Sequence, residues 1–144
     1  MDTKKYLGQL ENIDRRIKDK ISESERWRSI AKGAKYGNND GSRVQTSVNY
    51  DKLGDAVSLA VDYENESKEL ARQLALLKHK ITKQIDGMEN ELFYNILKSH
   101  YINEKSFVEI AAQEHYSYKQ IKRYYEQAIV YFEKKYGSEY LSLK

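Results

Sequence analysis

The stretch that decides the fold runs from Ser106 to Arg123 and reads SFVEIAAQEHYSYKQIKR. It holds two signatures of a helix start, in which a serine is followed three positions later by a Glu or Gln: Ser106 with Glu109, and Ser117 with Gln120. Each pair can satisfy backbone N–H groups that the first turn of a helix leaves without a partner. The serines stand eleven residues apart, which leaves room for a two-turn helix, a break and a new helix.

We therefore predict a helix over about residues 107–114, a break at 114–116 and a further helix over about 118–136. Ala111 and Ala112 supply the small side chains that two crossing helices need where they approach closely. Three further positions are expected to form the shared core: Ile110, Tyr116 and Ile121. This arrangement is a helix-turn-helix.

An apolar face precedes this motif, over about residues 89–101. Its members recur at helical spacing: Leu92, Phe93, Ile96, Leu97 and Tyr101. Together with the two helices that follow, this pattern predicts a small C-terminal domain over residues 88–136. We expect the tail over residues 137–144 to fray from Gly137.

The N-terminal part of the chain shows two long helical patterns, over residues 3–36 and 51–86. In each, mostly apolar or small side chains recur every three or four positions: Tyr6, Leu10, Ile13, Ile17, Ile21, Ser24, Trp27 and Ala31 in the first, and Leu53, Val57, Ala60, Glu64, Ser67, Leu70 or Ala71, Leu74, Leu77, Ile81 and Ile85 in the second. The second stripe is weak at Glu64 and Ser67 and strong from Leu70 on. A stripe this narrow is not stable alone. We expect the two helices to pair as a long antiparallel, coiled-coil-like hairpin over residues 1–87.

Turn-forming residues mark the limits of this hairpin. The run of Gly, Asn and Asp from Gly37 to Gly41 predicts a mobile loop over residues 37–50. Asp51 is expected to cap the second long helix, and Gly87 to end it in the left-handed conformation. The expected fold class is all-α.

The C-terminal motif resembles a known family of DNA-binding domains. The similarity is to the helix-turn-helix of sigma factor region 4, over about residues 88–133, and rests on these positions: Glu109-Ile110-Ala111, Tyr116-Ser117 and Ile121. The turn departs from that family, which usually carries leucine then glycine where this chain has Glu114 and His115. A left-handed residue other than glycine costs roughly 1 kcal/mol or more, although His tolerates that conformation better than most.

The order of the two halves extends the resemblance. A long hairpin with residues 44–47 (VQTS) and 51–57 (DKLGDAV), followed by a helix-turn-helix, looks like small phage regulators of Gram-positive bacteria, the ArpU- and RinA-like late transcription regulators. This resemblance implies control of phage or prophage transcription, with double-stranded DNA as partner and host RNA polymerase as a candidate partner. The chain lacks the other sigma regions that bind core polymerase, so a full sigma factor is not implied.

On this interpretation the helix from Tyr118 enters the major groove with its N-terminal residues at the base edges. The candidate DNA-binding residues are Ser117, Tyr118, Lys119, Gln120, Lys122 and Arg123. Gln can pair bidentately with adenine, and Arg or Lys with guanine. We assign Lys122 to a phosphate, and Ser117 with the helix N-terminus to another. The alternative for the three cations is an ordinary solvated face.

The composition argues against several other classes of protein. The absence of proline from 144 residues favours helices. With no cysteine and three isolated histidines, we expect no metal site and no cofactor. Neither a Gly-rich phosphate loop, an HExxH pattern nor a nucleophile elbow is present, so we expect no enzyme. No apolar run approaches the ~18 residues of a membrane span, and no signal peptide is evident, so a cytoplasmic protein is expected.

Two other functions fit the same elements. A small terminase subunit also joins a helix-turn-helix to long helices, although usually in the opposite order. A protein-binding adaptor or inhibitor would grip a host protein with the hairpin. Because Ile13, Ile17 and Trp27 lie on a stripe that one partner helix is not expected to cover fully, we also expect a homodimer through the hairpin.

Overall fold

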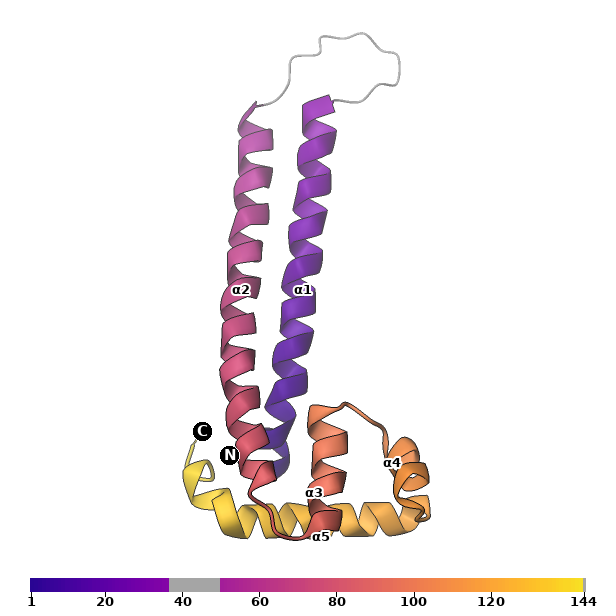
Figure 1. Ribbon diagram of the computed structural model, residues 1–144. Helices are drawn as coiled ribbons and strands as arrows, with labels where there is room; N and C mark the ends of the chain where they lie inside the picture. The colour runs from indigo at the N-terminus through magenta and orange to yellow at the C-terminus, as the bar shows by residue number, and fades with distance from the viewer. Residues whose placement is uncertain (37–49, 144) are drawn as a thin grey trace. The chain divides into compact units, whose positions relative to one another are not determined.

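The computed structural model describes residues 1–36 and 50–143 of the chain (Figure 1). Its elements are all helical: α1 (Thr3–Tyr36), α2 (Tyr50–Asp86), α3 (Glu91–Leu97), the π-helix η1 (Lys98–Ile102), α4 (Phe107–Glu114), α5 (Tyr118–Tyr136) and the 3-10 helix η2 (Gly137–Glu139). The all-α prediction is thereby confirmed. The loop predicted over residues 37–50 lies outside the described residues, apart from Tyr50, where α2 begins.

The two long helices, α1 and α2, lie side by side and run in opposite directions, as expected of a hairpin (Figure 1). Ion pairs between them show the antiparallel register. Lys20 Nζ lies 2.9 Å from Glu66 Oε2, and the Arg28 guanidinium donates to the Glu64 carboxylate. Because these pairs are open to solvent, water and salt screen them and they contribute little to stability, so the apolar contact between the helices has to supply most of it.

Small side chains form the contact line between the helices within residues 13–73. Ala31 of α1 and Ala56 and Ala60 of α2 are buried there. The prediction that Ile21 and Val57 point inward is wrong, since their exposed fractions are 44% and 41%. Val57 follows the buried Ala56 by one position, about 100° round the helix, and therefore falls on the flank of the contact.

The chain divides into two compact units, and the division does not fall at residue 87. One unit comprises Met1–Asn12 and Leu74–Lys144, and the other comprises Ile13–Gln73. The sequence predicts one domain over residues 1–87 and another over 88–136. The ends of both long helices instead belong with the short C-terminal helices.

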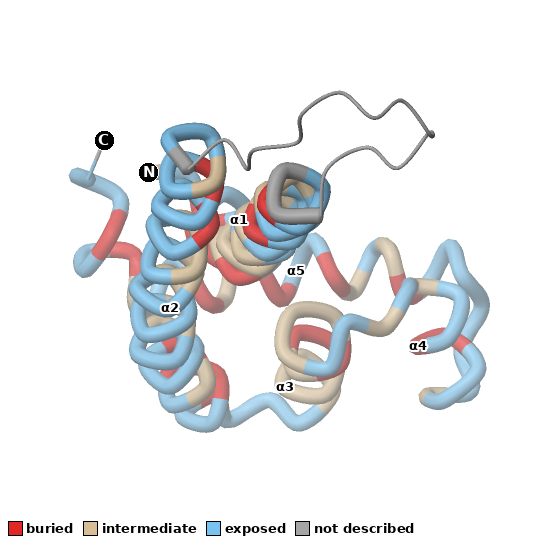
Figure 2. Tube along the Cα trace, turned by 90° about the horizontal axis from the view of Figure 1, so that it is seen from above, coloured by how far each residue is buried: buried red, intermediate tan, exposed pale blue. Residues whose placement is uncertain are grey.

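Burial explains why the helix ends belong to the C-terminal unit. Leu7 of α1 and Ile81 and Ile85 of α2 are fully buried in the same apolar core as residues of α3, α4 and α5. Buried positions recur along one side of α5, with exposed positions between them (Figure 2). The helix contributes five of its residues to this core: Ile121, Tyr125, Ala128, Ile129 and Phe132.

The C-terminal tail is part of this core, so the prediction that it frays from Gly137 is wrong. Tyr140 is 1% exposed. Its hydroxyl lies 2.8 Å from Thr3 Oγ1, and the hydroxyl of Tyr6 donates to Gln84 Oε1 at 2.7 Å. The tail is held because the start of α1 provides a buried aromatic and polar surface for it.

Two predicted ends of α2 also differ from the structure. The helix begins at Tyr50, so Asp51 lies in its first turn and not at the cap. In the first turn its carboxylate still interacts favourably with the positive end of the helix dipole. Gly87 is not left-handed. The hydroxyl of Tyr136 occupies the place that a Cβ at residue 87 would take, and the Lys135 ammonium donates to the Gly87 carbonyl. Close approach, and not backbone conformation, therefore disfavours a larger residue at this position, since the Tyr136 side chain would have to move.

The helical pattern predicted over residues 89–101 is shorter at its start and irregular at its end. Asn90 caps α3, with its side chain accepting the Phe93 N–H at 3.1 Å. After Leu97 the chain continues as the π-helix η1. This wider turn brings the aromatic side chains of η1 towards the helix-turn-helix.

Candidate nucleic-acid interface

The turn between α4 and α5 is built as the two serine signatures predict. Ser106 Oγ accepts the Glu109 N–H at 3.2 Å and so begins α4. The helix ends at His115, which adopts the left-handed conformation with φ 61° and ψ 38°. The N–H groups of His115 and Tyr116 both turn back to the Ala111 carbonyl. His115 thus adopts a backbone conformation that favours glycine.

The second helix, α5, has a complete capping box. The Gln120 N–H donates to Ser117 Oγ at 3.1 Å, and the Ser117 N–H donates to Gln120 Oε1 at 3.1 Å. At the start of α4 only half of the box forms, because the Glu109 carboxylate accepts from the Ser106 hydroxyl. The first turn of α5 is therefore the more firmly fixed of the two.

The packing between the two helices agrees with the prediction in part. Ile110, Ala111 and Ile121 are buried, as expected. Ala112 is exposed, and Tyr116 is 38% exposed, so their predicted places at the helix contact are wrong. The Tyr116 ring instead packs edge-on against Tyr124, with the ring centroids 5.3 Å apart. This contact covers one side of the turn without entering the core.

Four of the six predicted DNA-binding residues come together at the N-terminal end of α5. Ser117, Lys119, Gln120 and Arg123 line one open hollow on the surface. Tyr118 stands beside them with an exposed fraction of 52%. Within the part of the chain that the structure describes, neither Lys119 nor Arg123 has a carboxylate within ion-pair distance. Two cations without an ionic partner beside a helix N-terminus make this hollow attractive to anions.

Lys122, the sixth predicted residue, is held elsewhere. It is half-buried, and its ammonium lies 4.4 Å from the centroid of the Phe107 ring and 5.6 Å from that of Tyr125. A cation over an aromatic face gains about 0.5–2 kcal/mol. The structure therefore gives Lys122 an intramolecular contact that links α5 to α4, where the sequence suggested a phosphate.

An aromatic cluster behind the helix-turn-helix fixes the angle between its helices. The His100 imidazole of η1 stacks on Phe107 at 4.3 Å and meets Tyr125 edge-on at 5.6 Å. Its Nδ1 lies 3.1 Å from the Lys105 carbonyl oxygen. The Tyr101 and Tyr125 hydroxyls are 2.5 Å apart, and burial raises the pKa of both phenols. This role of His100 was not predictable from the sequence, because a π-helix leaves no simple periodic pattern.

The carboxylates closest in sequence to the candidate residues already have partners within the protein. Glu126 forms an ion pair with Lys4 at 2.8 Å, and Glu114 accepts from the Gln113 amide at 2.9 Å. Glu109 accepts from the Ser106 hydroxyl. The neutral donors on Glu114 and Glu109 leave those carboxylate charges in place, but within the described residues none of the three acids forms an ion pair with Lys119 or Arg123.

The described residues contain no group of three or more His, Cys, Asp or Glu side chains that could hold a metal ion. None of the helices within residues 1–36 and 50–143 combines the length and apolar character needed to cross a membrane. No family model, no curated protein and no solved structure matches this chain.

Proposed function

We propose that this chain is a sequence-specific DNA-binding transcription regulator of phage or prophage origin, acting in the cytoplasm of its host. The observation that carries the proposal is the hollow at the start of α5, where Lys119, Gln120 and Arg123 share one surface of a helix-turn-helix. In this class of motif the N-terminal residues of the second helix meet the base edges in the major groove. The phage assignment rests on the resemblance described above.

The proposed mechanism divides the work among the residues of the hollow. Lys119 and Arg123 attract the duplex and release its counterions, which makes binding depend on salt. The first turn of α5, held by its capping box, presents its side chains to the bases from a rigid backbone. The hairpin is left free to contact a protein, for which host RNA polymerase is a candidate. No catalytic step is proposed.

The test is a binding titration of a labelled duplex against the wild type and the Lys119→Ala/Arg123→Ala double variant at two salt concentrations. We expect the double variant to bind more weakly and to have a shallower dependence on salt, by about one unit of slope for each phosphate that is no longer neutralised. The Lys78→Ala/Lys80→Ala variant of α2 is the matched control, since it removes the same charge from exposed positions. If the folded double variant binds as the wild type does, the recognition helix is wrongly assigned.

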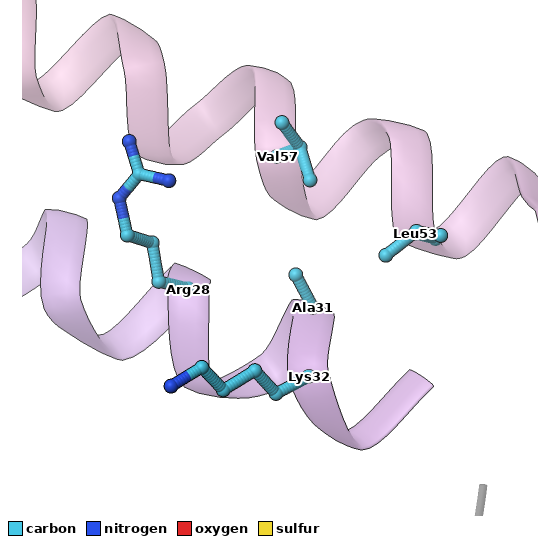
Figure 3. Close-up of a pocket in the computed structure, with 5 residues that line it drawn as sticks. All are labelled: Arg28, Ala31, Lys32, Leu53 and Val57. Atoms are coloured by element: carbon cyan, nitrogen blue, oxygen red, sulfur yellow. The ribbon is translucent and has the colours of Figure 1, made fainter. Parts of the chain in front are cut away.

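A specific observation supports the adaptor function as the second candidate. Beside the contact line of the hairpin lies a hollow of about 360 Å³ lined by Arg28, Ala31, Lys32, Leu53 and Val57 (Figure 3). Val61, one helical turn beyond Val57, is also exposed. Exposed apolar side chains around a hollow are typical of protein-binding surfaces. Their binding partner would be a second copy of the chain or a host protein.

Two measurements separate the second candidate from the first. A Val57→Asp/Val61→Asp variant is expected to abolish a homodimer or a host-protein complex, as measured by light scattering, and to leave DNA binding by the isolated chain unchanged. A stable host complex combined with weak, salt-insensitive DNA binding would favour the adaptor over the regulator. A wild-type protein that is monomeric at tens of micromolar, roughly the range in which weak dimers form, would contradict the homodimer.

A further inference from the structure

In the capping box of α5, the carbonyl oxygen of the Gln120 side chain is already hydrogen-bonded. This oxygen, Oε1, accepts the Ser117 N–H at 3.1 Å, while the backbone N–H of Gln120 donates to Ser117 Oγ. An amide side chain carries one acceptor oxygen and one NH2 group with two donors. With the oxygen turned back to the helix start, Gln120 offers its surroundings N–H donors alone.

This hydrogen bond disfavours the adenine contact that the sequence suggested for Gln120. Bidentate recognition of adenine needs an acceptor for the adenine N6 amino group and a donor for N7, side by side. Gln120 could supply both only by releasing the Ser117 N–H. Adenine recognition would therefore have to break the reciprocal half of the capping box at the start of α5.

The other nitrogen groups of the hollow are also donors. Lys119 carries three N–H donors and Arg123 carries five, and neither has an acceptor. The hydroxyls of Ser117 and Tyr118 can either donate or accept hydrogen bonds. Among the described residues that line the hollow, none carries a carboxylate. The hollow is therefore strongly biased towards donating hydrogen bonds.

We propose that this surface is specific for guanine in the major groove, with Gln120 as a specificity-determining residue. This inference rests on the proposed function. Guanine presents two adjacent acceptors there, O6 and N7, whereas cytosine presents a donor and adenine presents a donor beside its acceptor. Thymine offers a single acceptor and so can satisfy only one of the donors. A surface of N–H donors therefore matches guanine best. At cytosine or adenine these donors face the amino group of the base, which is also a donor and is left without an acceptor.

The first experiment identifies the preferred duplex by selection from a random library and then replaces each guanine in it singly. Replacement by 7-deazaguanine removes the N7 acceptor, whereas inosine keeps O6 and N7 and removes only a minor-groove group. We expect 7-deazaguanine to weaken binding at least fivefold at one or more positions, near the lower limit for a good bidentate contact. Inosine at the same positions is expected to change binding by less than about twofold.

The second experiment reverses the chemistry of Gln120 while keeping its structural role. Gln120→Glu retains the capping box, since a Glu serves at this position as well as a Gln, but replaces the NH2 donors by a carboxylate. We expect an unchanged unfolding temperature, at least tenfold weaker binding to the guanine site, and a shifted preference towards cytosine, whose N4 amino group can donate to Glu. Gln127→Glu, an exposed position two turns along α5, is the matched control for the added charge.

The outcomes distinguish this inference from the function on which it rests. If the selected site contains no guanine, if 7-deazaguanine has no effect, or if Gln120→Glu keeps the wild-type preference, guanine recognition is wrong while salt-dependent DNA binding still supports the regulator. If no duplex is bound in a salt-dependent way, the proposed function fails and the inference fails with it. Retained specificity in Gln127→Glu together with its loss in Gln120→Glu would establish the proposal.

Discussion

The ring of Tyr140 lies flat on the ring of Tyr6, with the centroids 4.2 Å apart and the planes 1° from parallel. Residues from opposite ends of the chain thus form one face of the apolar core. The Thr3 and Tyr140 hydroxyls, 137 positions apart in sequence, lie within hydrogen-bond distance of one another on the same side. Because the contact is buried, it holds the start of α1 against the segment that follows η2 and gives the tail a structural role.

The first prediction concerns the stability that this tail contributes. Tyr140→Ala removes a buried ring and should lower the free energy of unfolding by about 3–5 kcal/mol, as core aromatic truncations do. Tyr140→Phe removes only the hydroxyl contact with Thr3 and should cost about 0.5–1.5 kcal/mol. Urea unfolding measures both, and the exposed Leu143→Ala serves as control. Equal effects for Tyr140→Ala and Leu143→Ala would contradict the packing of the tail.

The second prediction concerns stability at alkaline pH. Burial raises the pKa values of Tyr101 and Tyr125 above the ordinary value of 10.0. Above that pH the unfolded chain loses the phenol protons while the folded protein keeps them. The two buried phenols therefore contribute their full stabilisation below about pH 10. Above that pH the free energy of unfolding falls, by up to about 1.4 kcal/mol per pH unit for each phenol, until the pH reaches the pKa of the folded state.

Urea unfolding between pH 8 and pH 11 measures this decline. Tyr101→Phe is the informative variant, because Phe cannot ionise in either state. It lowers stability at pH 8, where Tyr125 is left without the partner of its hydroxyl, yet it should flatten the decline above pH 10. A decline as steep as that of the wild type would show that Tyr101 is not protected from ionisation.

The third prediction compares two glycines. Gly87→Ala places a methyl group on the Tyr136 hydroxyl and should cost about 1–3 kcal/mol, the usual range for overpacking. Gly54→Ala lies in α2 with open space around it and should stabilise the protein by about 0.5–1 kcal/mol. Thermal unfolding gives both values. Adding Tyr136→Phe should recover part of the stability that Gly87→Ala removes, and strict additivity of the two changes would refute the clash.

The helix bounds were predictable where local chemistry sets them. Ser106 and Ser117 each accept the N–H of the residue three positions on, and α4 and α5 begin where those serines indicated. Signals of this kind lie within a few residues of the feature they specify, so one sequence suffices to find them. The left-handed conformation of His115, two positions before Ser117, was not predicted by the spacing of the two serines, since spacing does not set the φ of a single residue.

Features that depend on residues distant in sequence were not predicted. Nothing near Tyr140 indicates that the start of α1 will cover it, and nothing near Gly87 indicates the approach of Tyr136. In the candidate site the sequence grouped Lys122 with its neighbours on the strength of charge alone. Its direction is decided by Phe107, which comes from another helix.

The last prediction separates the two roles considered for Lys122. Since its ammonium lies over the Phe107 ring, Lys122→Ala should lower the free energy of unfolding by about 0.5–2 kcal/mol because it removes the cation–π interaction. The salt dependence of DNA binding should stay as in the wild type, whereas Lys119→Ala should reduce its slope by about one unit. Lys122→Arg keeps a cation that can stack on the ring and should restore most of the stability. The measurements are urea unfolding and duplex titrations at two salt concentrations. A reduced salt slope in Lys122→Ala, with unfolding unchanged, would return this lysine to the phosphate role and show that the aromatic contact is given up when DNA binds.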